Sequence, residues 1–169
     1  MSRTNFLSGK NIIIYILVAY AFYYLYKYRQ NEPPPYYSTI PNFEIKTING
    51  KKFNLYDIKL KKVIVFLTTN NIYSNFYKKD IIKLKYIAEK KGWYFIVFVN
   101  TKQNKNDALK YISNKYYKGV EKDLYLTNIK KVEYIFGINS WPFMVILDEN
   151  NRLIYASKVP NIKEINKIL

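Results

Sequence analysis

The sequence of 169 residues contains neither cysteine nor histidine. The absence of cysteine excludes disulfides, thiol nucleophiles and dithiol redox centres. The absence of histidine removes the usual general base near neutral pH and the commonest metal ligand. The remaining reactive side chains, mainly carboxylates, lysines, tyrosines and hydroxyls, form no evident catalytic pair in the sequence. We therefore expect no enzymatic activity, no cofactor and no bound metal.

Arginine is scarce, because only Arg3, Arg29 and Arg152 occur, although lysine brings the net charge to +16. Such a charge favours an anionic partner such as acidic protein or anionic lipid. An AT-rich genome is the alternative explanation, since its codons favour the abundant Lys, Asn, Ile, Tyr and Phe. Arginine is the preferred phosphate-binding side chain, and no nucleic-acid-binding signature is visible. We therefore expect no nucleic-acid partner.

Residues 12–26 form an uncharged, largely apolar stretch flanked by Lys10, Lys27 and Arg29. A helix needs about 20 residues to cross the bilayer, and flanking lysines and tyrosines can extend a shorter span at the interface. The segment predicts a transmembrane anchor over residues 11–28, after an N-terminal tail over residues 1–10. A cleaved signal peptide and a buried helix are the alternatives. Bulky tyrosines at the cleavage region and the lack of a polar face disfavour them.

The positive charges on the two sides of this segment nearly balance, so the charge rule for orientation decides little. A short tail before the segment and a large domain after it favour a translocated domain. We expect a single-pass inner-membrane protein with its domain in the bacterial periplasm. The mitochondrial inner membrane, with the domain facing the intermembrane space, is the alternative.

A proline-rich linker is predicted over residues 29–40, because Pro33, Pro34 and Pro35 follow one another. Consecutive prolines favour a stiff polyproline II spacer, although they can equally serve only to stop the preceding helix. The folded domain is then predicted over residues 41–169.

Hydrophobic patterns in this domain predict a mixed α/β fold. The Asn49-Gly50 pair is a strong hairpin signal, and the continuous apolar runs are typical of strands covered on both faces. Strands that alternate with helices indicate a partly parallel sheet, closed by an antiparallel hairpin and a last helix. The predicted strands cover residues 43–48, 51–53, 63–68, 93–99, 143–147 and 152–157, and the predicted helices cover 74–91 and 106–116 and begin near 127 and 160.

Several short motifs occur in a characteristic order: Pro41-Asn42-Phe43, Lys62-Val63-Ile64-Val65-Phe66, and Phe136-Gly137-Ile138-Asn139-Ser140-Trp141-Pro142. Together they resemble membrane-anchored thioredoxin-like proteins of the cytochrome c maturation type, within the redoxin group. The resemblance covers about three quarters of the chain. It implies a thioredoxin-like fold with an N-terminal β-hairpin extension.

Active members of that group carry Trp-Cys-x-x-Cys after the central strand, and the matching cysteine positions are here Asn71 and Ser74. Neither residue offers a thiolate, and without histidine the serine has no ordinary base to activate it. The redox step is therefore absent. Both residues suit helix N-caps, and the alternative is a polar pocket that binds a peptide backbone without reacting.

Pro142 matches the cis-proline of the group, so the resemblance implies a cis Trp141–Pro142 bond. In active relatives this loop pairs with an extended substrate. Ser140, Trp141 and Pro142 are therefore candidates for strand-like peptide binding. The alternative is a retained turn that only supports the fold.

These observations favour a redox-inactive structural or protein-binding subunit of a membrane assembly, with protein partners and with lipid contacts through residues 11–28. The alternative function is a non-catalytic peptide holder or chaperone related to cytochrome c maturation or thiol-disulfide pathways. An enzyme of another kind on the same fold is disfavoured, because a fold alone supplies no reaction.

Overall fold

The computed structural model describes residues 9–29, 32–47, 50–68, 76–100, 106, 110, 124–126 and 129–168. The chain divides into two compact units, Met1–Glu32 and Pro33–Leu169. The second unit thus begins eight residues before the position predicted for the domain. Residues 37–40 explain the difference, because their backbone hydrogen-bonds to the C-terminal part of the sheet.

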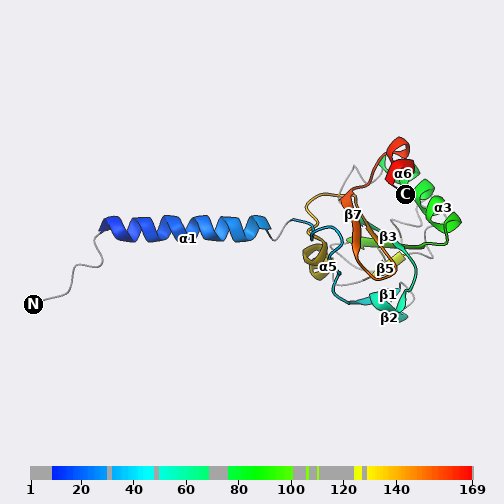
Figure 1. Ribbon diagram of the computed structural model, residues 1–169, viewed down its shortest axis with the longest axis horizontal. Helices are drawn as coiled ribbons and strands as arrows, with labels where there is room; N and C mark the ends of the chain where they lie inside the picture. The colour runs from blue at the N-terminus through cyan, green and yellow to red at the C-terminus, as the bar shows by residue number, and fades with distance from the viewer. Residues whose placement is uncertain are drawn as a thin grey trace, which may run out of the picture. The chain divides into compact units, whose positions relative to one another are not determined.

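The first unit contains one α-helix, α1 (Gly9–Arg29), drawn in blue in Figure 1. Its large apolar side chains are exposed on every side, Phe22 at 68% and Leu17 at 61%. Within the described part of the chain, no helix has the length and apolar character needed to cross a membrane. The helix predicted over residues 11–28 is therefore present as α1, but the prediction that it spans a membrane is not supported. Six tyrosines, together with lysine at each end, lower its mean hydropathy.

The second unit is built on a seven-stranded mixed sheet with the order β2-β1-β5-β4-β3-β6-β7. The central strands β3 and β4 run parallel, and β6 and β7 continue the sheet in antiparallel fashion. The strands are β1 (Glu44–Thr47), β2 (Lys52–Asn54), β3 (Lys62–Thr68), β4 (Tyr94–Asn100), β5 (Leu124–Leu126), β6 (Phe143–Leu147) and β7 (Leu153–Lys158).

The predicted strands are confirmed with small changes at their ends, and β1 and β2 form the expected hairpin. The short β5 was not predicted. It pairs with β1 and β4 over only two positions each, which is too few for a periodic signal. The predicted helix over residues 106–116 lies outside the described residues, apart from Asn106 and Lys110, which are both helical.

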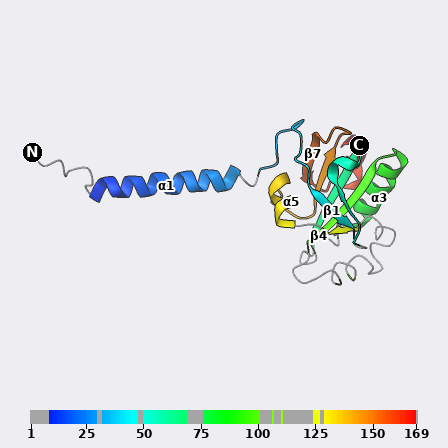
Figure 2. The same ribbon diagram turned by 90° about the horizontal axis from the view of Figure 1, so that it is seen from below.

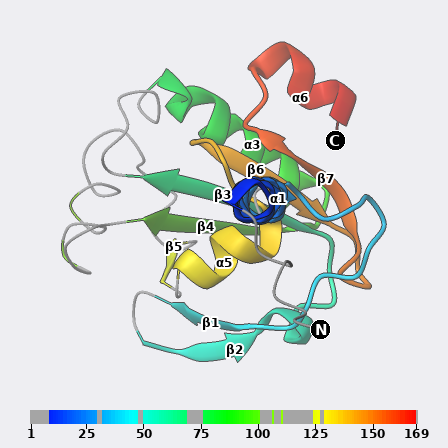
Figure 3. The same ribbon diagram turned by 90° about the vertical axis from the view of Figure 1, so that its left-hand side faces the viewer.

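Helices cover both faces of the sheet, as Figures 2 and 3 show. On one face, α3 (Lys78–Lys90) and α6 (Ile162–Ile168) pack against Val63, Val65 and Leu67 of β3. On the other face, α5 (Ile129–Phe136) packs against Ile64 and Phe66 of the same strand. Successive side chains of a strand point to opposite faces, so a strand covered on both sides is apolar throughout. This explains the uninterrupted apolar run in the sequence.

An aromatic cluster of Phe43, Phe66, Phe98 and Phe136 fills the α5 side of the core. The Phe66 ring centroid lies 5.4 Å from that of Phe98 and 5.5 Å from that of Phe136. Both neighbours also contact the Phe43 ring, with centroid distances of 6.4 and 6.1 Å. The cluster therefore ties β3, β4, α5 and the segment before β1 together.

Candidate functional site

The candidate site lies where β3 and β4 end and β6 begins. Thr68, the last residue of β3, is level with Asn100, the last residue of β4. On the other side of β3, Phe66 pairs with Phe143, the first residue of β6. Because β3 and β6 are antiparallel, the loop before Phe143 lies at the same end of the sheet as Thr68. Ser140, Trp141 and Pro142 form this loop, so the register brings them to the carboxyl ends of the parallel strands.

The loop of residues 140–142 is held from one side and accessible from the other. The Trp141–Pro142 peptide bond is cis, in agreement with the resemblance. Pro142 is buried, and its carbonyl oxygen accepts a hydrogen bond of 3.3 Å from the Val159 N–H just after β7. Ser140 and Trp141 are half-buried, and the Trp141 ring packs against the core cluster on the α5 side. The loop therefore presents two partly exposed residues on a fixed backbone.

A polar pair at this end of the sheet was missed by the sequence analysis. The Asn100 Nδ2 donates a 3.1 Å hydrogen bond to Glu133 Oε1 on α5. Partial burial raises the pKa of Glu133, while the Asn100 hydrogen bond and the charge of Lys130 offset part of that shift. The pair is 33 residues apart in the sequence. The sequence signal for this pair was that Asn100 directly follows the apolar run of residues 95–99, at the sheet edge where α/β folds place their ligands.

Asn71 and Ser74, the two residues predicted to stand at the cysteine positions of the motif, lie outside the described residues. The structure describes the chain up to Thr68 and again from Phe76, with α3 beginning at Lys78. Whether Asn71 and Ser74 cap a helix or line a pocket therefore stays a prediction. Thr68 itself lies at the same sheet edge as the loop of residues 140–142.

The described side chains at this edge offer hydrogen bonding rather than covalent chemistry. The described part of the chain holds no group of three or more carboxylates arranged to bind a metal ion. Backbone amides and carbonyls of an irregular loop, a hydroxyl and an indole can recognise an extended polypeptide.

Comparison with solved structures identifies the architecture. The thioredoxin domain of a thiol-disulfide oxidoreductase from Bacteroides vulgatus is 16% identical, with a TM-score of 0.67 over 80% of this chain and 96% of that chain. A protein described as the thiol:disulfide interchange protein DsbE of Chlorobium tepidum is 12% identical, with a TM-score of 0.66 over 79% and 92%. The fold is thioredoxin-like.

A third similar structure, the exposed lipoprotein thioredoxin of Streptococcus pneumoniae, is 18% identical, with a TM-score of 0.60 over 75% of this chain and 96% of that chain. No protein-family profile matches this chain, and no curated protein matches it. At these identities the comparisons establish the thioredoxin-like fold alone. The similar proteins are described as thioredoxins or thiol-disulfide proteins, whereas this thioredoxin-like chain has no cysteine with which to exchange thiols.

Proposed function

We propose that the thioredoxin-like domain binds an extended polypeptide segment at the loop of residues 140–142 without reacting with it, as the protein-binding subunit of a larger assembly. The observation that carries the proposal is the fixed loop with partly exposed Ser140 and Trp141 at the carboxyl end of β3, in a chain without cysteine. Dithiol catalysis needs both a thiolate and a surface that holds the substrate. This chain lacks the first and keeps a surface suited to the second.

The physical basis of binding is strand-like pairing. An extended segment pairs through its main chain, so affinity depends little on its sequence, and adjacent side chains add contact area. The Trp141 ring supplies that area, because large half-buried aromatic rings often dominate interface energetics. The alternative function, a non-catalytic holder of translocated chains, would use the same surface. An assembly subunit keeps its bound segment permanently, whereas a holder releases it.

Substitution of Trp141 tests this proposal. We expect Trp141→Ala to weaken binding of a fluorescein-labelled, cysteine-free, Thr- and Val-rich peptide at least about tenfold, equivalent to about 1.4 kcal/mol. Fluorescence anisotropy with the full chain in detergent measures the dissociation constant. The matched control is Trp93→Ala, because Trp93 is also half-buried but lies before β4, at the opposite end of the strand. Equal affinities of the two variants would rule out binding at the loop.

We also propose that α1 attaches the protein to lipid. The support is that its apolar side chains are exposed on all sides and that the sequence from Gly9 to Arg29 contains no acidic residue. A single partner helix would cover only one stripe, whereas lipid covers every side. Lys10, Lys27 and Arg29 favour anionic headgroups. Placement in an inner membrane, with the domain translocated, belongs to the same proposal.

Liposome flotation checks lipid attachment. We expect the full chain to float with vesicles containing phosphatidylglycerol, and the double variant Ile14→Asp and Leu17→Asp to remain below. Each aspartate replaces an apolar side chain that contacts lipid with a charged one, so the bound fraction should fall about tenfold or more. The matched control, Tyr86→Asp with Ile82→Asp, places the same charges on exposed positions of α3. If the α1 variant floats as well as this control, lipid attachment through α1 is refuted.

A further inference from the structure

Residues 37–40, predicted as part of a spacer, pair with residues 151–153 on the outer edge of the sheet through an isolated β-bridge and backbone hydrogen bonds. The Tyr37 N–H donates a 2.7 Å hydrogen bond to the Leu153 carbonyl, and the Leu153 N–H donates a 3.0 Å bond to the Ser38 carbonyl. The Ile40 N–H donates a 2.9 Å bond to the Asn151 carbonyl, and Thr39 forms an antiparallel bridge with Arg152. Since β7 is the last strand of the sheet, these residues cover part of an edge that is otherwise open to pairing.

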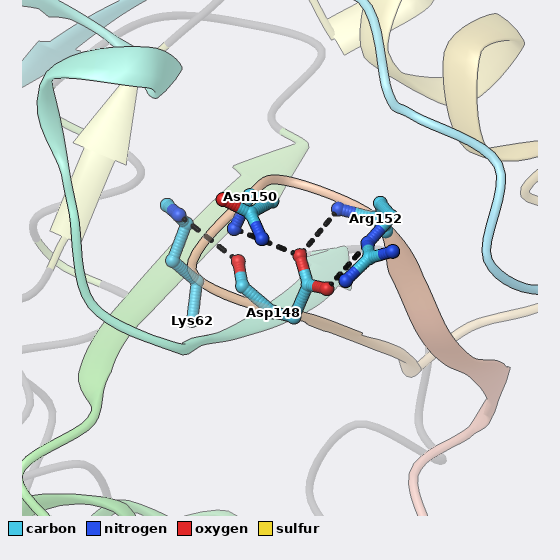
Figure 4. A network of polar contacts seen from close by, with 4 residues as sticks. All are labelled: Lys62, Asp148, Asn150 and Arg152. Carbon is cyan, nitrogen blue, oxygen red and sulfur yellow. Dashed lines mark hydrogen bonds and ion pairs between the residues drawn. The ribbon is translucent and has the colours of Figure 1, made fainter.

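The edge that receives this segment is shaped by a hydrogen-bonded turn over residues 148–152. The Asp148 carboxylate accepts bonds from the Arg152 N–H and Nε, both 2.8 Å, and from the Asn150 N–H at 2.9 Å. Figure 4 shows this network together with Lys62. We call this network around the Asp148 carboxylate the clasp. It orients the backbone of Asn151 and Arg152, the residues that face the added strand.

The clasp is fixed to the core through a buried lysine. The Lys62 side chain is fully buried, and its Nζ donates to the Leu60 carbonyl at 3.0 Å and to the Asp148 carbonyl at 3.4 Å. Burial lowers the pKa of Lys62, and the charges of Asp148 and Glu149 oppose this shift. Burial alone would raise the pKa of Asp148, but the hydrogen bonds from Arg152 and Asn150 hold it below its usual range. The carboxylate is therefore ionised at neutral pH and remains a strong acceptor.

The two ends of the added segment are held very differently. Ile40 is fully buried, and its carbonyl oxygen accepts a 2.7 Å bond from the Tyr56 hydroxyl. Tyr37 is 72% exposed and adopts a φ of 64°, a left-handed conformation that is unfavourable for a bulky side chain. Ile40 thus acts as a fixed end. Residues 37 and 38 are attached to the sheet by two backbone hydrogen bonds with Leu153, and Tyr37 adopts an unfavourable backbone conformation to make them.

We infer that residues 37–39 form a releasable edge strand, a latch that closes the start of β7 and is kept closed by the clasp. In the closed state the latch pairs with Leu153 and the adjoining turn. In the open state Ile40 stays in the core, and the backbone N–H and carbonyl of Leu153 are exposed to solvent.

Hydrogen–deuterium exchange of the full chain in detergent tests the latch. Removing the carboxylate in Asp148→Ala should speed deuterium uptake by peptides covering Tyr37 and Ser38 about tenfold or more, because opening becomes easier while the core stays folded. Peptides covering β3 should keep wild-type uptake. The matched control is Glu149→Ala, which removes the same charge from an exposed neighbour in the same turn.

A second variant opens the latch from its other side. Tyr37→Pro removes the N–H that bonds Leu153 and cannot adopt the observed φ, yet it alters no buried side chain. We expect the same acceleration at Ser38 and also at the Leu153 amide. If uptake in this region matches wild type in both Asp148→Ala and Tyr37→Pro, the latch is refuted. If β3 also loses protection in Asp148→Ala, the substitution has unfolded the core, and the Tyr37→Pro variant alone then tests the latch.

Discussion

The double variant Asn71→Cys with Ser74→Cys should convert the cysteine-free chain into a thiol-disulfide oxidoreductase. The thioredoxin-like fold supplies the scaffold, and the two cysteines restore the spacing of the dithiol motif. A motif thiol whose pKa falls from about 8.5 to about 7 has about fifteen times more thiolate at pH 7. That thiolate attacks a substrate disulfide to form a mixed disulfide. The second thiolate then displaces the substrate thiolate, leaving the protein oxidised and the substrate reduced.

Insulin reduction by dithiothreitol measures this gain, since dithiothreitol returns the oxidised protein to its dithiol form. We expect wild type at the buffer rate and the double variant at least about tenfold faster. The single variants should turn over much more slowly, because they lack the second thiol and their mixed disulfides must be resolved by dithiothreitol from solution. The spacing control is Asn71→Cys with Asn75→Cys, which moves the second thiol by one residue. Equal rates for the two double variants would show that Asn71 and Ser74 are not the motif positions.

Phe66→Ala should lower the free energy of unfolding by about 3–5 kcal/mol. The ring is fully buried and contacts two other phenyl rings, so truncation leaves a cavity at the junction of β3, β4 and α5. Loss of the ring pairs adds to the transfer cost. Urea unfolding of the full chain in detergent, followed by tryptophan fluorescence, measures the change.

The control for this loss is Tyr86→Ala on α3, where the side chain is 66% exposed. A surface truncation of this kind should change stability by less than about 0.5 kcal/mol. A loss below about 1 kcal/mol in Phe66→Ala would contradict the enclosed aromatic cluster.

The core of the fold could be predicted because its signals are local and continuous. Residues 63–67 are apolar without interruption since β3 is central and covered on both faces. The same reasoning correctly placed β4 and β6. β5 could not be found in this way, because three residues that pair at two positions carry no measurable period.

The features that were missed depend on contacts between distant residues. Lys62 looks like an ordinary charged boundary before an apolar strand, yet it is fully buried against the turn at Asp148, 86 residues away. Asn100 and Glu133 likewise meet only after folding. The three prolines follow the first unit, but proline patterns cannot show that residues 37–40 pair with residues 151–153. The loop of residues 140–142 was predicted only because its motif resembles a known group.

The central claim is that this cysteine-free thioredoxin-like domain binds an extended segment at the loop that precedes β6. The most direct measurement is an NMR titration of the ¹⁵N-labelled full chain in detergent micelles with the cysteine-free peptide. The account predicts the largest amide shifts at Ser140 and Trp141, with smaller shifts at Asn100 and Val159. Shifts confined to other parts of the domain, or none at saturating peptide, would contradict it.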